Sequence, residues 1–200
     1  MLDDISDIKV KFYKKVFSTV LGDMLAIANN DALYLLEFTN RINLSKSIHS
    51  FLRYNNLDSI NDIPDSSNKI LAKVNQELDL YFKGKLERFS IPLELQGTKF
   101  QIKAWQALLK IPFGNIISYA SQAKMLNKPT AFRAVANANS LNKLSIIVPC
   151  HRVIATNGAL GGYAGGIERK EYLLDLELKC IKYSKFYYFS GVITPQLVSY

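Results

Sequence analysis

The sequence predicts an α/β protein built from two units, the first rich in strands and the second mostly helical. Polar and apolar residues alternate early in the chain, as in half-buried strands, whereas later segments repeat their apolar residues at helical spacing. With 48% hydrophobic residues, 200 residues suffice for two small units that each have a core. We expect domains at residues 1–92 and 93–180, followed by a tail at 181–200 to which we assign no role.

The first unit begins with strand patterns. The segments KVKFYKKVF (9–17) and DMLAIANNDALYLLEF (23–38) alternate in polarity, and NND within the second is expected to form a hairpin turn. One helical pattern follows, KILAKVNQELDLYFKG (69–84), which Gly84 closes. Strands and a single helix therefore predict a small α/β unit.

The second unit begins with an amphipathic helix and continues with a helix-turn-helix pattern. Thr98 is the expected N-cap of TKFQIKAWQALLKI (98–111). Two short helices come next, SYASQAKML (118–126), capped by its first serine, and AFRAVANAN (131–139), with Pro129 or Thr130 at its start. Two short helices joined by so tight a turn are typical of a helix-turn-helix.

Positive charge is concentrated in the second half of the chain. The net charge is +8, and residues 91–200 hold 13 basic and 5 acidic side chains. No Asp or Glu stands between Leu95 and Ile167. A solvated face is the ordinary explanation, but such faces normally mix both signs. A polyanionic partner, most simply nucleic acid, is therefore favoured.

The second helix of the helix-turn-helix is unusually small, with four alanines and Arg133 as its only charge. An ordinary alanine-rich helix with a solvated arginine is one interpretation. The other is a helix whose backbone approaches DNA closely and carries one long cation forward. The absence of acidic residues nearby favours the second interpretation.

Nothing in the sequence indicates export or a membrane. No apolar run approaches the roughly 20 residues of a membrane-spanning helix, and the N-terminal segment MLDDISDIKVKF is acidic where a targeting segment would be basic. Two cysteines do not form a disulfide framework, so we expect a reducing compartment, the cytoplasm.

The segment LSIIVPCHRV (144–153) places Cys150 beside a histidine and an arginine. A free thiol is mostly protonated at neutral pH, and a nearby base or cation raises its thiolate fraction. In an extended strand, His151 would point away from the thiol, so direct contact requires the chain to turn after Pro149; otherwise a water must carry the proton. The alternative is a buried structural cysteine next to a hydrogen-bonded histidine.

A third member of this site is expected on the helical segment GIERKEYLLDLELKC (166–180). Glu177 shares a face with Leu173 and Leu174, which should be buried, and a buried carboxylate needs a partner. His151 is a candidate, which would give a nucleophile, a base and an orienting group. The alternative is a surface Glu at the edge of the core. Cys180 has no histidine nearby and is interpreted as structural.

Five of the ten glycines lie in GALGGYAGG (158–166). A glycine-rich turn is the plain interpretation. Glycines also let a planar ligand lie against the backbone, with Tyr163 supplying a face, and a flipped base would suit such a pocket.

These motifs resemble those of the O6-alkylguanine-DNA alkyltransferases, the methylated-DNA–protein-cysteine methyltransferases. The resemblance rests on IIVPCHRV and GALGGYAGGIERKEYLLDLE and extends upstream, covering about residues 98–178. It implies a ribonuclease-H-like first domain and a winged helix-turn-helix-like second domain. It also implies a monomer that binds double-stranded DNA and takes the alkyl group of O6-alkylguanine, and of O4-alkylthymine, irreversibly and once. No cofactor is implied, and without a cysteine before Cys150 we expect no zinc.

The resemblance implies chemical roles for five residues. Cys150 would be the alkyl acceptor. His151 would be the base, acting through water and held by Glu177. Tyr119 would donate a hydrogen bond to N3 of the flipped guanine, and Lys170 would assist it.

The resemblance also implies five binding residues. Backbone groups of Val153 and Ala164 would read the edge of the base, and Tyr163 would wall the pocket. Arg133 would enter the duplex in place of the extruded nucleotide. Asn142 would tie the recognition helix to the active-site turn.

Three other functions are kept as alternatives, of which a pure helix-turn-helix regulator would make Cys150→Ser harmless. An alkyltransferase-like protein would bind damaged DNA without transfer, but such relatives lack the acceptor that Cys150 provides here. A Cys-His hydrolase with a basic surface would leave the helix-turn-helix and Arg133 without a role.

Overall fold

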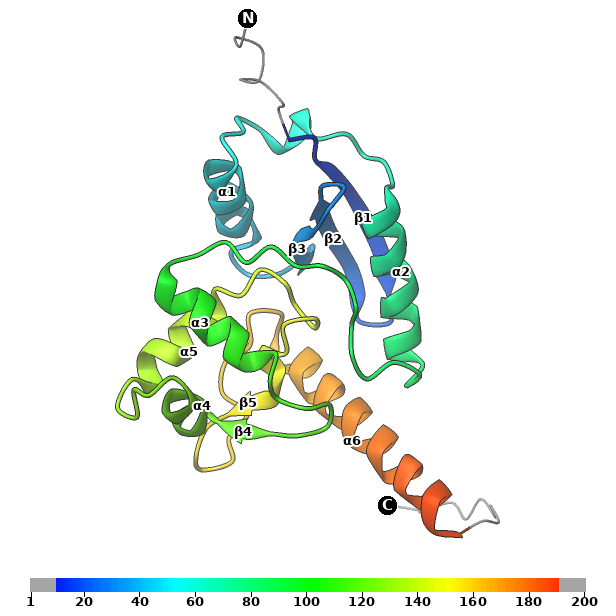
Figure 1. Cartoon of the computed structure of the whole chain (residues 1–200), viewed down its shortest axis with the longest axis vertical. Coiled ribbons are helices and arrows are strands. Elements are labelled where there is room, and N and C mark those ends of the chain that lie inside the picture. Colours follow the sequence, from blue (N-terminus) through cyan, green and yellow to red (C-terminus); the bar gives the residue numbers. More distant parts are fainter. Residues whose placement is uncertain (1–9, 191–200) are drawn as a thin grey trace, which may run out of the picture.

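The computed structural model describes residues 10–190 of the chain, with side chains up to residue 182. Figure 1 shows a small sheet with a helix on each side in the upper half of the molecule and a mainly helical part below it. The predicted succession of a strand-rich and a helical unit is therefore confirmed.

The sheet has three antiparallel strands in the order β1-β2-β3, which span Tyr13–Thr19, Gly22–Ala28 and Leu33–Phe38. The predicted hairpin between β2 and β3 is confirmed. The side chain of Asn29 closes it by accepting from the backbone N–H groups of Asp31 and Ala32, each at 2.8 Å.

Both faces of the sheet are buried because each is covered by a helix. Side chains from alternate positions of β2 and β3 pack on α1 (Leu44–Tyr54) on one face and on α2 (Lys69–Phe82) on the other. A short 3-10 turn, Ile60–Asp62, lies between the two helices. As predicted, α2 ends just before Gly84, whose φ of +67° favours glycine.

The prediction of a single helix in this unit is wrong, because α1 is a second one. Its apolar residues, Leu44, Ile48, Phe51 and Leu52, follow helical spacing. The pattern was present in the sequence, but it lies among polar residues and has no side-chain N-cap.

The first helix of the second unit, α3 (Lys99–Leu108), begins at Thr98 as predicted. Thr98 accepts a hydrogen bond from the N–H of Gln101 at 3.3 Å, and the Gln101 side chain accepts from the N–H of Thr98 at 2.9 Å. This capping box satisfies two N–H groups at the helix start. The helix ends three residues before the predicted end, because Pro112 disfavours helical conformation in the residue before it.

The predicted helix-turn-helix is present. It consists of α4 (Tyr119–Met125), capped by Ser118, and α5 (Phe132–Ser140), which pack against each other and against α3. The expectation that Pro129 or Thr130 starts the second helix is wrong. A separate turn closes there, with the N–H of residue 131 donating to the carbonyl of residue 128 at 2.9 Å, and α5 begins after it without a side-chain cap.

Two short parallel strands bring the start of α4 next to the cysteine segment. β4 (Ile117–Ser118) pairs with β5 (Val153–Ile154), and β5 directly follows the 3-10 turn η2 (Cys150–Arg152). Tyr119 therefore begins its helix beside the segment that carries the thiol.

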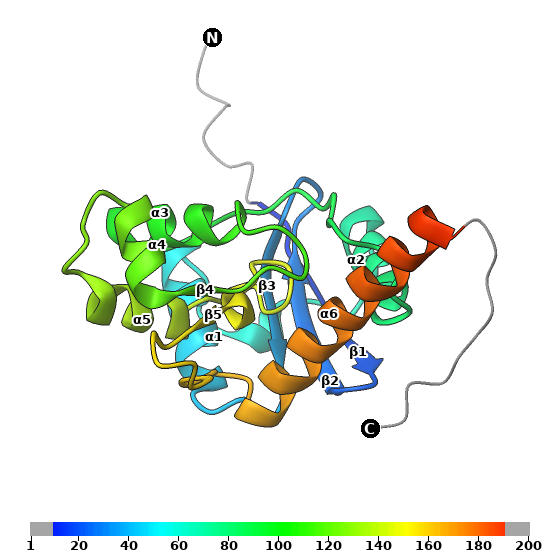
Figure 2. The same cartoon turned by 90° about the horizontal axis from the view of Figure 1, so that it is seen from below.

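The last helix, α6 (Ile167–Ser190), crosses beneath the molecule and extends away from it, as Figures 1 and 2 both show. It continues without a break through residue 180, where the tail was expected to begin, while residues 191–200 lie outside the described part. Among the described helices, none is long and apolar enough to cross a membrane.

The two units share one hydrophobic core and a backbone connection. The N–H of Leu36 in β3 donates to the carbonyl of Lys143, and the N–H of Ser145 donates to the carbonyl of Leu36, both at 2.8 Å. The loop before Cys150 is thus held along the edge of the first unit's sheet.

Candidate active site

Cys150 opens the η2 turn, so the chain does turn directly after Pro149. Its thiol is free and its residue is only 8% exposed. The sulfur accepts a hydrogen bond from Nδ2 of Asn142 at 3.3 Å, and the same nitrogen donates to the carbonyl of Val148 at 2.9 Å. Asn142 thereby fixes the thiol relative to the loop before it.

Glu177 is the most heavily hydrogen-bonded side chain of the site. Its carboxylate accepts from the Tyr81 hydroxyl at 2.8 Å, from the Gly114 N–H at 2.9 Å, from Nε of Arg152 at 2.9 Å and from the imidazole of His151 at 2.9 Å. Burial alone would raise the pKa of Glu177, but His151 and Arg152 outweigh burial and lower the pKa to about 2. The carboxylate is therefore ionised at neutral pH.

The ionised carboxylate fixes the tautomer of His151. Because Glu177 can only accept, Nε2 of the ring carries the proton, which leaves Nδ1 with a free lone pair. Burial lowers the pKa of His151 below its ordinary value, although Glu177 opposes this shift, so the ring is neutral. Nδ1 is buried and has no hydrogen-bond partner among the described residues. A neutral imidazole with an unused lone pair can act as a base.

Two cations act on the thiol, and neither is its sequence neighbour. Burial raises the pKa of the Cys150 thiol, while the Asn142 hydrogen bond and the charges of Arg41 and Lys170 oppose the rise. Arg152 instead turns towards Glu177 and donates to the carbonyl of Ile111 at 2.7 Å. The thiol is therefore protonated at rest and needs a base to react.

Lys170 is fully buried and braces the segment after the thiol. Its ammonium group donates to the carbonyl of Val153 at 2.6 Å and to that of Leu160, and it lies 5.8 Å from the centre of the Tyr119 ring. Burial lowers the pKa of Lys170 to about 8. Burial and the facing thiol raise the pKa of Tyr119, so its hydroxyl remains a donor.

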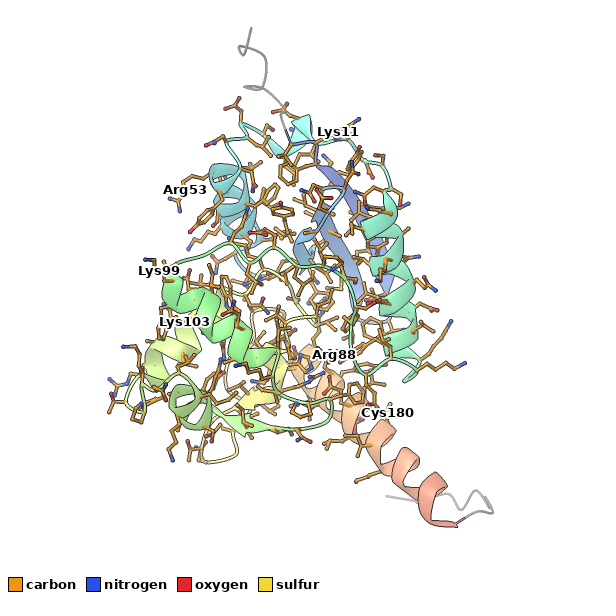
Figure 3. All side chains as sticks on the ribbon, in the orientation of Figure 1. Lys11, Arg53, Arg88, Lys99, Lys103 and Cys180 are labelled. Carbon is orange, nitrogen blue, oxygen red and sulfur yellow. The ribbon has the colours of Figure 1, made fainter. Side chains whose placement is uncertain are left out.

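A cavity of about 600 Å³ is lined by Tyr119, Tyr163 and Ala164. Next to Tyr119, glycine is favoured at position 161, because a Cβ there would lie 3.3 Å from the Tyr119 hydroxyl and the φ of Gly161 is +67°. Basic side chains also line the cavity. Its lining cations are Arg41, Lys46, Arg53 and Lys143. Figure 3 shows Arg53 of α1 on the same side of the molecule as Lys99 and Lys103 of α3.

The structure joins most of the predicted site residues. Hydrogen bonds connect Cys150 to Asn142, His151 to Glu177, and Lys170 to Val153. Arg133 lies apart from them, on the exposed side of α5, with its guanidinium 5.7 Å from the centre of the Phe132 ring.

Sequence reasoning missed Tyr81 and Arg41. Both belong to the first unit, and their partners lie 96 and 101 residues further along the chain. No local pattern marks either residue, since a lone tyrosine in an amphipathic helix and a lone arginine in a turn are ordinary.

Comparison with known proteins gives a family for both units. Residues 12–95 match the ribonuclease-like domain, and residues 99–179 the DNA-binding domain, of 6-O-methylguanine DNA methyltransferase. A methylated-DNA–protein-cysteine methyltransferase of Methanosarcina acetivorans is 36% identical over 171 residues, which covers 84% of this chain and 99% of the relative. One of Mycobacterium leprae is 52% identical over 110 residues, which covers 55% and 67% of the two chains.

Solved structures agree with this. Mycobacterium tuberculosis OGT in complex with DNA has a TM-score of 0.72 at 34% identity and covers 84% of this chain and 94% of that one. The O6-methylguanine-DNA methyltransferase of Pyrococcus kodakaraensis has a TM-score of 0.61 at 28% identity, covering 83% and 98%. The predicted fold and the resemblance are both confirmed. The chain belongs to the methylated-DNA–protein-cysteine methyltransferase family.

Proposed function

We propose that the chain repairs O6-alkylguanine, and O4-alkylthymine, in double-stranded DNA by moving the alkyl group once and irreversibly onto Cys150. The observation that carries this proposal is that one 3-10 turn holds a protonated, buried thiol and a neutral histidine whose Nδ1 is free. The thiol also faces the Tyr119 phenol, which lines the cavity, and a nucleophile, a base and a phenol donor together suit attack on an alkyl carbon.

The proton moves first in this mechanism. His151 takes it from the thiol through a bridging water at Nδ1, while Glu177 stabilises the resulting imidazolium. The thiolate then attacks the alkyl carbon, an S–C bond forms and the O6–C bond breaks. Guanine leaves with the electron pair, and Tyr119 donates a proton to N3. The phenolate recovers its proton from the imidazolium, so the thiol proton ends on guanine.

Lys170 and the loop backbones position the base. Lys170 holds the carbonyl of Val153 and lies near the Tyr119 ring, so it keeps the donor and the reading edge together. The N–H of Ala164 would stabilise the charge that develops on O6, and Tyr163 would wall the base. The product is a thioether, and none of the side chains of the site can cleave its S–C bond. Each protein molecule therefore acts once.

DNA binding is assigned to the helix-turn-helix, α4 and α5, in the basic half of the chain. The small, exposed α5 would approach the duplex and carry Arg133 into the space of the extruded nucleotide. Flipping a base costs a few kcal/mol, and less for a damaged pair.

The two domains, 1–92 and 93–180, are supported by family matches that meet between residues 95 and 99. We infer a monomer, and the free cysteines suit the cytoplasm.

A titration with a duplex that contains one O6-methylguanine tests the proposal. One methyl group per protein molecule is expected, located on the Cys150 peptide by mass spectrometry. Repeated turnover would favour the hydrolase alternative. Binding without transfer would favour the alkyltransferase-like alternative, and a methyl group on another residue would contradict the assigned acceptor.

A further inference from the structure

Arg41 reaches from the first unit into the loop that carries the thiol. It follows β3, and its side chain is only 3% exposed. The two Nη atoms donate to the carbonyls of Asn142 at 2.9 Å and of Ser140 at 2.7 Å, where α5 ends. Carbonyls at the end of a helix carry partial negative charge, so a guanidinium there makes strong, charge-assisted hydrogen bonds.

The same strand holds the next residues of the loop. Glu37, which forms an ion pair with Arg41, accepts from the Ser145 hydroxyl at 2.7 Å. Leu36, which precedes Glu37 in β3, makes the two backbone hydrogen bonds to the loop that join the units. Two side chains and one backbone segment of β3 and its turn therefore fix the loop on either side of Asn142.

Asn142 passes this constraint to the sulfur. Its backbone carbonyl is held by Arg41, its Oδ1 accepts from the N–H of Leu144 at 3.0 Å, and its Nδ2 donates to Cys150. Rotating the Asn142 side chain would therefore break its contacts with Leu144 and Cys150. The guanidinium is thus one residue away from the hydrogen bond that holds the acceptor.

The charges around the thiol make Arg41 more important than its distance in sequence suggests. The charged and titratable groups that act on the sulfur are Lys170 of α6, Tyr119 of α4, Tyr163 of the glycine-rich loop and Arg41, while His151 follows Cys150 in η2. The phenols and the imidazole are neutral. Burial lowers the pKa of Lys170 to about 8, so its charge is lost as the pH rises through about 8. Arg41 is the cation that stays charged, because a guanidinium keeps its proton even when burial lowers its pKa.

We propose that Arg41 is a positioning residue of the transfer reaction, through which the first unit holds Asn142 against the sulfur and favours the thiolate. The inference rests on the proposed function only in taking Cys150 as the acceptor. It assigns to the ribonuclease-like domain a direct effect on the chemistry of the other domain.

The test compares Arg41→Gln and Arg41→Lys with Arg88→Gln, which removes an exposed arginine of the same unit. Iodoacetamide labelling of the Cys150 peptide is followed by mass spectrometry across pH, and single-turnover methyl transfer and the thermal midpoint are measured on the same samples. The pH of half-maximal labelling should rise by about one unit in Arg41→Gln, which is about tenfold slower labelling at neutral pH. Transfer should slow by at least that factor, Arg41→Lys should recover most of both, and Arg88→Gln should match the wild type.

A lower thermal midpoint with an unchanged labelling profile would reduce Arg41 to an interdomain contact and overturn the proposal. If Arg41→Gln does not fold, Glu37→Gln decides, since it keeps the guanidinium and removes its counter-charge. The labelling midpoint should then fall, and a midpoint that stays or rises contradicts the proposal. If the wild type transfers no methyl group while Arg41→Gln still shifts the labelling profile, the proposed function fails, and only the effect of Arg41 on the Cys150 thiol stands.

Discussion

The surroundings of the two cysteines differ in a way that their exposure does not reveal. Cys150 is only 8% exposed, whereas Cys180 is half-buried. Cys180 lies on α6 and is labelled in Figure 3. Burial raises the pKa of both thiols. At Cys150 the charges of Arg41 and Lys170 oppose the rise, but at Cys180 the carboxylates of Glu177 and Glu87 add to it.

The difference teaches that thiol chemistry here is set by the sign of the facing charges. Glu177 acts in both surroundings, because it accepts a hydrogen bond from the ring of His151, the neighbour of Cys150, and its negative charge raises the pKa of Cys180. The carboxylates disfavour the thiolate of Cys180, whereas the cations favour the thiolate of Cys150.

The largest expected effect separates the two cysteines completely. Cys150→Ser should abolish methyl transfer, because a serine hydroxyl is far less acidic than a thiol and the neutral imidazole does not deprotonate it appreciably. Cys180→Ser should still accept one methyl group per molecule. Radiolabelled methyl from O6-methylguanine DNA, counted per protein molecule, measures both. Methyl transfer that persists in Cys150→Ser would contradict the assignment of Cys150 as the acceptor.

Glu177→Gln should act on the two thiols in opposite directions. An amide can donate to Nε2 of His151, which moves the ring proton to Nδ1 and blocks the base, so transfer should slow by about 10²–10⁴-fold. Iodoacetamide labelling of Cys180 should instead become modestly faster, because a facing negative charge is gone. Tyr81→Phe is the matched control, since it removes one hydrogen bond to Glu177 and keeps the carboxylate. Equal losses in both variants would show that hydrogen bonding, and not charge, matters.

Acid should weaken the fold through the same carboxylate. The pKa of Glu177 is about 2 in the folded chain against an ordinary value of 4.5, so its stabilisation is complete above pH 4.5 and is lost as the pH falls towards 2. A shift of this size corresponds to about 3 kcal/mol. His151 adds a loss that begins near pH 6.5, because its lowered pKa lets only the unfolded chain take up the proton there. Urea unfolding across pH measures the effect. The Glu177→Gln variant should lack the part below pH 4.5, and a parallel decline in both proteins would contradict the assignment.

The smallest effect concerns the packing of Cys180. Gly84 has a φ of +67°, and a Cβ added there would lie 2.6 Å from the Cys180 sulfur. Gly84→Ala should cost about 1–2 kcal/mol of unfolding free energy, measured in urea. It should also push the sulfur outwards, so that its labelling becomes faster while transfer to Cys150 stays unchanged. A slower transfer would mean that the two thiol environments are coupled through α6.

The sequence predicted the parts of the site that depend on nearby residues. Cys150 and His151 are adjacent, and helical spacing placed Glu177 on the buried face of α6. The fold followed for the same reason, since strand alternation and the Thr98 and Ser118 caps are local signals. Arg41 and Tyr81 could not be found in this way, because their contacts exist only once the two units have packed together. The helix α1 was missed for a different reason, because its apolar residues lie among polar ones and it has no side-chain N-cap.

The contact between the Tyr81 hydroxyl and Glu177 has a consequence for how such proteins can be recombined. A hybrid that joins the strand-rich half of another family member to this chain's helical half would replace the Tyr81 phenol that donates to the carboxylate bound to the imidazole. Exchanging halves would then alter reaction rates even where the surface that grips DNA is untouched. For protein engineering, the interface between the two halves therefore has to be treated as part of the active site.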